Sequence, residues 1–312
     1  MTGPLADPGV IAARAPESVT VWRRLGANTS VVAAGSVLVV LAALSLLAPV
    51  LGTIDPGLLD PINRDLLPGA SAEVLSFTGE SATHTFWMGT DSYGRDIYSR
   101  VLYGGRVSLL VGAIVAGLSV AAGMAIGLIS GYVRWLDGVV MRVMDGLMAI
   151  PGILLAIALV SLWRASLLTV VVAITIPEIP RVTRLVRSLV LSIREEPYVE
   201  AAAAVGTRTV PLLTRHVLPN TLAPLIVQAT YIGASAILVE SILSFLGVGL
   251  PTDVPTWGNI MAEGRLQFNQ YPHNVFFPGI FLALTVLAVN MLGDGLRDTL
   301  DPKLNRRAER RA

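Results

Sequence analysis

Apolar residues are gathered in long blocks along this chain rather than in stripes with a helical or strand period. A helix that crosses a bilayer needs ~20 mostly apolar residues, because each residue rises ~1.5 Å across a hydrocarbon core ~30 Å thick. The blocks that approach or exceed this length are 31–51, 107–133, 146–163, 221–246 and 275–293. The pattern therefore predicts an all-α, polytopic membrane protein.

A further block at 165–177 is uncharged but short, which is more typical of a buried or interfacial segment. Topology decides in favour of a span, because arginine and lysine concentrate on the cytoplasmic side of membrane helices. Without this span, either the arginines between 181 and 215 or the basic tail would lie outside. We therefore predict six transmembrane helices, with the N- and C-termini both cytoplasmic.

This topology divides the chain into consecutive parts. They are a cytoplasmic N-terminal segment (1–28), the first transmembrane helix (29–52), an extracytoplasmic loop (53–104), a core of five transmembrane helices (105–298) and a basic cytoplasmic tail (299–312). The extracytoplasmic loop is rich in Pro, Asp and Ser, and we expect little regular structure in its first half.

Within the core, a cytoplasmic loop at 194–220 has the signals of two short helices. Residues 195–197 suit a helix start, since acidic residues and proline are favoured in the first turn. The alanine run 201–204 has the highest helix propensity, and Gly206 can end the helix in a left-handed conformation. A second helix is expected from about 211, broken at 218–220 by its proline before the next span.

Composition excludes several functions. Hydrophobic residues make up 53% of the chain and charged residues only 14%, against ~25% charged in a typical soluble domain. The net charge of +1 gives no reason to expect nucleic acid as a partner. There is no cysteine, and the three histidines are scattered, so the sequence contains no usual metal-ligand spacing.

Catalytic patterns are also missing from the sequence. A phosphate-binding loop needs Gly-Lys-Ser/Thr, and the only lysine, Lys303, lies between proline and leucine. Any ATP would therefore have to be bound by another chain. We find no Ser-His-Asp order, no paired carboxylates in one span and no glycine-rich dinucleotide loop, so we predict no enzymatic activity and no cofactor.

The cytoplasmic loop contains the motif Glu200-Ala201-Ala202-x-x-x-Gly206, followed after nine residues by His216-Val217-Leu218-Pro219. It resembles the coupling loop of permeases in binding-protein-dependent ABC importers. The general pattern of that family has an aliphatic residue where His216 stands. A histidine followed by Leu-Pro-Asn is what the peptide-importer branch usually shows.

Further stretches resemble the C-type permease subunit of dipeptide and oligopeptide importers, a group that includes nickel importers. They are Met88-Gly89-Thr90-Asp91 with its continuation to 109, Glu240-Ser241 with its continuation to 258, and Gly293-Asp294-Gly295 with its continuation to 302. Together with the cytoplasmic loop they cover most of 85–304. Residues 1–84 add only a plausible first span.

The resemblance implies a type I ABC importer permease fold in the bacterial cytoplasmic membrane. It also implies the partners of such a machine: a homologous second permease, two ATPase subunits that hold ATP and Mg²⁺, an extracytoplasmic peptide-binding protein or lipoprotein, and membrane lipid. The residues it assigns to coupling with the ATPase subunits are Glu200, Ala201, Ala202, Gly206, His216, Leu218 and Pro219.

That role is physically reasonable, because a short helix held between two spans can seat in a groove on a partner and transmit rigid-body motion. The competing interpretation is an amphipathic loop resting on lipid headgroups, with its arginines against anionic lipid.

Candidates for a gate or pathway are Glu240, Ser244 and Pro151. Glu240 is an acid inside an apolar block, where an ionisable group is expensive and often functional. It could contact the amino terminus of a peptide, form a gating ion pair, or stabilise the turn at 244–249; its position in the outer third of the span favours the last. Pro151 should kink the span at 146–163, as a hinge or as architecture.

A ridge of small residues on the block 107–133 allows close helix packing, either within this chain or against a partner permease. Its members are Gly112, Ala116, Ser119, Gly123, Gly127 and Gly131.

The main functional hypothesis is therefore an ATP-coupled permease for di- and oligopeptides. An alternative keeps the fold but imports nickel chelates or another small solute. A more distant alternative is a secondary transporter driven by an ion gradient, which would usually show inverted repeats and ionisable residues at the midplane. A membrane scaffold is a third class, which the coupling loop disfavours.

Overall fold

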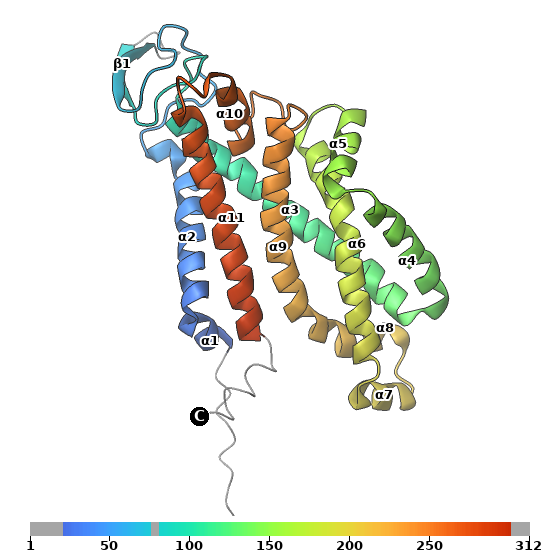
Figure 1. The fold of residues 1–312 in the computed structure, drawn as a ribbon. Coiled ribbons are helices and arrows are strands. Elements are labelled where there is room, and N and C mark those ends of the chain that lie inside the picture. The colour runs from blue at the N-terminus through green and yellow to red at the C-terminus, as the bar shows by residue number, and fades with distance from the viewer. Residues whose placement is uncertain (1–20, 76–80, 301–312) are drawn as a thin grey trace, which may run out of the picture.

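The structure is a computed structural model that describes residues 21–75 and 81–300 of the chain (Figure 1). Most of the predicted N-terminal segment and almost all of the basic tail lie outside these residues. The helices are α1 (Val21–Ala27), α2 (Thr29–Leu46), α3 (Ile97–Tyr132), α4 (Arg134–Ala149), α5 (Gly152–Leu162), α6 (Leu167–Ile193), α7 (Pro197–Ala204), α8 (Thr209–Leu212), α9 (Leu218–Phe245), α10 (Trp257–Gly264) and α11 (His273–Leu300). Short 3-10 turns cover Ala48–Val50 and Arg265–Gln267, and a π-helical turn covers Leu213–Val217.

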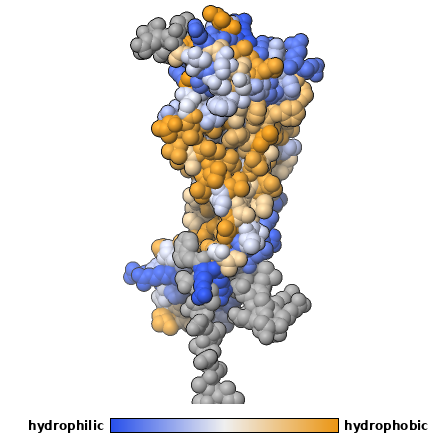
Figure 2. Space-filling view, turned by 90° about the vertical axis from the view of Figure 1, so that its left-hand side faces the viewer, coloured by the Kyte–Doolittle hydropathy of each residue, from blue (hydrophilic) through white to orange (hydrophobic). Residues whose placement is uncertain are grey.

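Within the described residues, four helical stretches are long and apolar enough to cross a membrane: α2, α3, the continuous stretch Thr209–Phe245 and α11. The bent pair α4–α5 raises the number to five if it counts as one span. An apolar belt encircles the middle of the visible face, with hydrophilic residues beyond it (Figure 2). The chain is therefore a multi-pass membrane protein, while the count of six spans remains a prediction.

The long helices form a bundle in which α3 crosses behind α9 and α6 and packs against both (Figure 1). The main core lies where these three helices meet. Its fully buried members include Val111 and Val115 of α3, Val182 and Val186 of α6, and Ile232 of α9.

The small-residue ridge of α3 packs inside this subunit. A Cβ added to Gly123 would lie 2.5 Å from Cβ of Val182, and one added to Gly127 would lie 2.7 Å from Cβ of Val186. The same close contact between a glycine of α3 and a valine of α6 repeats at Gly131, where an added Cβ would lie 2.9 Å from Cβ of Val190. Glycines four residues apart on α3 thus receive valines four residues apart on α6, which lets the backbones approach closely.

The extracytoplasmic loop holds more structure than its composition indicates. Strands β1 (Ala70–Leu75) and β2 (Ser81–Phe86) pair in antiparallel register, with Ala70 opposite Phe86, so the loop adds a small hairpin to a chain that is otherwise mostly helical, as predicted. The β-branched Thr83 and Thr85 and the aromatic Phe86 of β2 favour a strand. Helix α3 also begins ten residues before the apolar block, because the Asp96 side chain accepts hydrogen bonds from the backbone N–H groups of Tyr98 and Ser99.

The predicted span at 146–163 is broken rather than straight. Helix α4, which the apolar pattern did not predict, ends at Ala149, and α5 leaves at 88° to it. Pro151 lacks the N–H that a continuous helix needs, so the expected kink is a full break. Helix α4 is instead fixed to α6 by ion pairs, with Arg187 Nη2 2.6 Å from Asp137 Oδ2 and Arg184 paired with Asp145.

Candidate coupling site and candidate pathway residues

Helix α7 forms the tip of the molecule at the end opposite the β-hairpin (Figure 1). Glu196 is its N-cap residue and Pro197 fills the first turn, where a missing N–H costs nothing. The helix ends in a Schellman motif: the N–H of Gly206 donates to the carbonyl of Ala203 (3.0 Å), and that of Thr207 donates to Ala202 (3.1 Å). The backbone prediction for this helix is therefore confirmed.

Gly206 supplies the conformation that this motif requires. Its φ is +87°, in a region that L side chains rarely adopt. A Cβ at this position would meet nothing within 4 Å. The demand for glycine here comes from the backbone alone.

Helix α7 is fastened to the base of α9. The Tyr198 hydroxyl donates to the His216 carbonyl at 3.4 Å, and Asn220 Nδ2 donates to the same carbonyl at 2.8 Å and to the Tyr198 hydroxyl at 3.0 Å. Val199 is buried on the side of α7 that faces the bundle. Because α6 ends three residues before α7 begins, two long helices hold the tip.

The other side of α7 and the turn after it are exposed. Val205 is 87% exposed and Val210 is 68% exposed, which is unusual for valine. The other exposed residues of 195–210 are Glu195, Glu196, Pro197, Tyr198, Glu200, Ala201, Ala203, Ala204, Gly206, Arg208 and Thr209. The tip therefore presents a partly apolar surface with three carboxylates and one guanidinium.

The predicted break at 218–220 is wrong. Helix α9 begins at Leu218, and its N–H donates to the Leu213 carbonyl, five residues earlier, so the chain passes through a π-helical turn without interruption. Pro219 sits in the first turn of α9, where proline is tolerated. The π-helical turn thus joins α8 to α9 in one continuous rod.

The structure separates the predicted residues into two distant groups. Glu200, Ala201, Ala202 and Gly206 lie at the tip, with His216, Leu218 and Pro219 at the base of α9. Glu240 and Ser244 lie at the other end of α9, the end that packs against α10 (Figure 1).

Glu240 is fully buried inside the subunit. Its Oε1 accepts a hydrogen bond from the Ser244 hydroxyl at 2.8 Å, and Oε2 has no hydrogen-bond partner among the described residues. Two glycines pack closely against this region. A Cβ added to Gly249 would lie 2.3 Å from Oγ of Ser244, and a Cβ added to Gly258 would lie 2.6 Å from Cα of Ser241. This enclosure favours a structural role for Glu240.

Pro151 lies at the exposed break between α4 and α5. The next residue, Gly152, lies against α6, because a Cβ added to it would lie 3.4 Å from Cβ of Pro177. No hydrogen bond or ion pair among the described residues joins Pro151 to Glu240.

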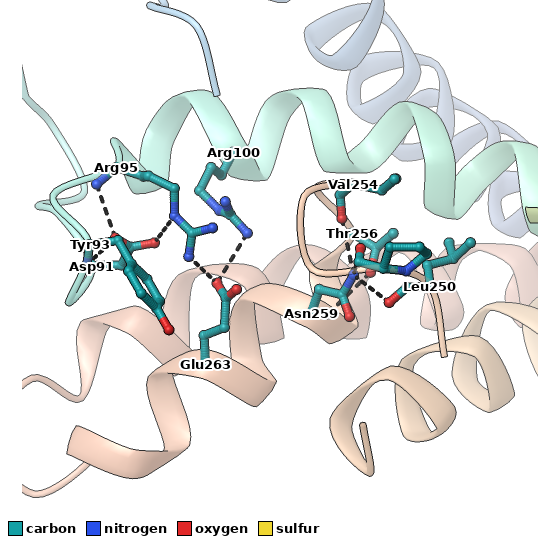
Figure 3. A network of polar contacts seen from close by, with 10 residues as sticks. Asp91, Tyr93, Arg95, Arg100, Leu250, Val254, Thr256, Asn259 and Glu263 are labelled. Carbon is teal, nitrogen blue, oxygen red and sulfur yellow. Dashed lines mark hydrogen bonds and ion pairs between the residues drawn. The ribbon is translucent and has the colours of Figure 1, made fainter. Parts of the chain in front are cut away.

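Sequence reasoning missed a polar network at the outer end of α3 (Figure 3). Arg95 Nε donates to Asp91 Oδ2 at 2.7 Å, and its Nη2 pairs with Glu263 of α10. Arg100 Nη2 lies 3.1 Å from the same Glu263 oxygen. Burial raises the pKa of the Glu263 carboxyl, and the attraction of Arg100 and Arg95 opposes that rise.

The same region is tied together by α10. Asn259 Nδ2 lies 2.9 to 3.2 Å from the backbone carbonyls of Leu250, Pro251 and Val254 (Figure 3). The Trp257 indole N–H donates to the Val101 carbonyl at 3.0 Å. Asp91, Arg95 and Arg100 stand in a quoted motif, whereas Glu263 lies outside the quoted motifs, and their pairing across distant parts of the sequence has no local signal.

Comparison with known proteins identifies the class. A family model described as "Binding-protein-dependent transport system inner membrane component" matches residues 119–306. The chain belongs to this family of membrane components of binding-protein-dependent transport systems, which confirms the resemblance drawn from the motifs.

Individual relatives carry more specific names. A probable peptide ABC transporter permease of Sinorhizobium fredii is 48% identical over 92% of this chain and 94% of its own length. A dipeptide transport system permease of Alkalihalophilus pseudofirmus is 46% identical over 72% of this chain and 74% of its own. A glutathione transport system permease of Pectobacterium atrosepticum is 42% identical over 72% and 75%.

A solved structure supports the fold. An inward-facing chain of the MetNI methionine ABC transporter matches with a TM-score of 0.52, at 17% identity, over 64% of this chain and 96% of the other. The helical core therefore has the fold of an ABC transporter permease.

Proposed function

We propose that this chain is the permease subunit of an ATP-driven importer of di- and oligopeptides and forms half of its translocation pathway. Family membership and the peptide, dipeptide and glutathione permeases among its relatives support this cargo class. The observation that carries the coupling role is the exposed, doubly held tip formed by α7.

The tip can act as a lever. An ATPase subunit that gripped the exposed face around Glu200 would pull on α6 through the short link after Ile193. It would also pull on α9 through Tyr198, Asn220 and the π-helical turn. Since both helices are packed on α3, motion of α7 would become rigid-body motion of the core.

The rest of the machine follows from the same proposal. Two ATPase subunits bind ATP and Mg²⁺, a homologous second permease completes the pathway, and an extracytoplasmic binding protein delivers the peptide. The bent pair α4–α5 and helix α6 serve as the third and fourth of six spans in the bacterial cytoplasmic membrane. Both termini and α7 then face the cytoplasm.

The test uses the reconstituted complex of permeases, ATPase subunits and binding protein. Glu200→Arg should abolish most of the stimulation of ATP hydrolysis by peptide-loaded binding protein. Asp298→Arg makes the same charge change at an exposed position near the cytoplasmic end of α11 and should have little effect. If Glu200→Arg assembles normally and keeps full stimulation, α7 is not the lever.

Cargo is tested separately. A strain that lacks this permease should lose uptake of labelled di- and tripeptides and regain it with the intact gene. If peptide uptake is unchanged and nickel uptake is lost instead, the peptide assignment is wrong.

A further inference from the structure

Helix α6 carries a polar stripe that stays exposed in this subunit, although Arg184 within it pairs with Asp145 of α4. Its exposed residues in the cytoplasmic half are Arg181, Arg184, Ser188 and Ser192, at spacings of three and four that place them on one face. The opposite face carries the buried valines that receive the glycines of α3. In a chain with few charges, this face is poorly suited to contact with lipid tails.

The upper end of this stripe lies at mid-membrane depth. An added Cβ at Gly123 of α3 would lie 2.5 Å from Cβ of Val182 and 3.1 Å from the Ile179 carbonyl, so these residues share one level. Gly123 stands near the middle of the uncharged block 107–133. Along the axis of α3, which crosses the bundle obliquely (Figure 1), it lies about 14 Å from the end of the helix at Tyr132, at ~1.5 Å per residue. Arg181 and Glu178 flank this level.

Arg181 and Glu178 form an ion pair that uses only one nitrogen of the Arg181 guanidinium. Arg181 Nη1 donates to both Glu178 carboxylate oxygens, at 3.2 and 2.9 Å. The Glu178 side chain is 11% exposed, whereas that of Arg181 is 57% exposed. Nε and Nη2 of Arg181 have no hydrogen-bond partner among the described residues, so they point donors out of the subunit.

A second observation shows that this depth needs water or a covering protein. The break between α4 and α5 meets α6 at Pro177, one residue before Glu178, through the close contact of Gly152. Ile150, Pro151 and Gly152 are exposed at this break. Interrupted backbone at membrane depth is tolerated only where protein covers it or water fills a cavity. A charged side chain at this depth has the same requirement.

We propose that Arg181, oriented by Glu178, binds the C-terminal carboxylate of a peptide in the aqueous pathway at mid-membrane. This inference rests on the proposed peptide transport and adds a site to it. The guanidinium edge that carries Nε and Nη2 matches a carboxylate in two parallel hydrogen bonds. Glu178 occupies the remaining side and keeps the guanidinium directed outward.

The absence of cysteine makes a direct test practical. Arg181→Cys is placed in the complete complex, with cysteine-free partner subunits, and uptake of labelled trialanine is measured. Reaction with 2-aminoethyl methanethiosulfonate restores a positive charge, and 2-sulfonatoethyl methanethiosulfonate adds a negative one. Leu168→Cys, at a 73% exposed apolar position of the same helix, is the matched control.

We expect Arg181→Cys to lower trialanine uptake about tenfold, the effect of losing a charge-assisted hydrogen bond. The aminoethyl reagent and the substitution Arg181→Lys should recover most of it, and the sulfonatoethyl reagent should not. Uptake by the Leu168→Cys variant should not respond to either reagent. Trialanine should also slow modification of the thiol introduced at position 181, while trialanine amide, which lacks the carboxylate, should not.

The inference is overturned if Arg181→Cys transports at the wild-type rate, if charge restoration has no effect, or if the introduced thiol is inaccessible to both reagents. Failure of the parent proposal is recognised separately, because the wild-type complex would then not import trialanine at all.

Discussion

The left-handed residue after α7 offers a prediction in which backbone strain can be separated from side-chain contact. The perturbation is a pair of substitutions, Gly206→Ala and Gly206→Asn. Both add a Cβ to a residue at φ +87°, and neither Cβ meets an atom within 4 Å in this chain. Asparagine tolerates the left-handed region better than alanine does, although its side chain is larger.

The magnitude follows from the dihedral angle. A left-handed conformation costs an ordinary L residue about 1–2 kcal/mol. That energy opposes the two hydrogen bonds that end α7, from Gly206 to Ala203 and from Thr207 to Ala202. It reduces the population of the capped loop relative to the frayed loop by up to about 5- to 30-fold for alanine.

The assay is stimulation of ATP hydrolysis by peptide-loaded binding protein in the reconstituted complex. We expect the order wild type, then Gly206→Asn, then Gly206→Ala. The reverse order of the two variants would show that a steric contact with the ATPase, rather than backbone conformation, sets the requirement. Equal activity of all three proteins would refute the reasoning on the cap.

The remaining predictions concern packing and buried charge. Gly127→Ala should lower the melting temperature of the purified complex in detergent, because its Cβ would lie 2.7 Å from Cβ of Val186, an overpacking that costs about 1–3 kcal/mol. The control is Gly117→Ala on the same helix, where an added Cβ meets no atom within 4 Å, so the substitution should be neutral or stabilising. Equal melting temperatures of the two variants would contradict close packing of α3 against α6. Glu240→Gln should retain transport and melting temperature, since an amide keeps the acceptor for Ser244; loss of transport in a normally assembled variant would indicate a functional charge. Glu263→Ala should lower the melting temperature, because it leaves the buried Arg100 unpaired and Arg95 with Asp91 alone, at about 3–5 kcal/mol for a broken buried pair. An unchanged melting curve would count against the outer network as a stabilising element.

Local signals explain what the sequence could predict. The alanine run followed by Gly206 specified α7 and its cap, because both depend on neighbouring residues. The glycine ridge of α3 indicated close packing, although only the structure identifies α6 as the main partner. A kink at Pro151 followed from its missing N–H, although the structure has a full break there.

The errors come from interactions that hydropathy does not record. The first turns of α3 are polar and owe their helix to capping by Asp96. Helix α4 is amphipathic, and its ion pairs reach Arg184 and Arg187, 39 and 50 residues away. The continuous π-helical turn before Pro219 depends on a five-residue hydrogen bond that a proline rule does not anticipate.

The most direct measurement of the central claim is a photo-crosslink from α7 in the assembled complex. A benzophenone maleimide would be attached to a single cysteine that replaces Ala203, which is exposed on the tip, or Trp87, 65% exposed at the other end of the molecule. The account predicts a covalent adduct with an ATPase subunit from position 203 and none from position 87. An ATPase adduct from position 87, or no ATPase adduct from position 203 in an active complex, would contradict it.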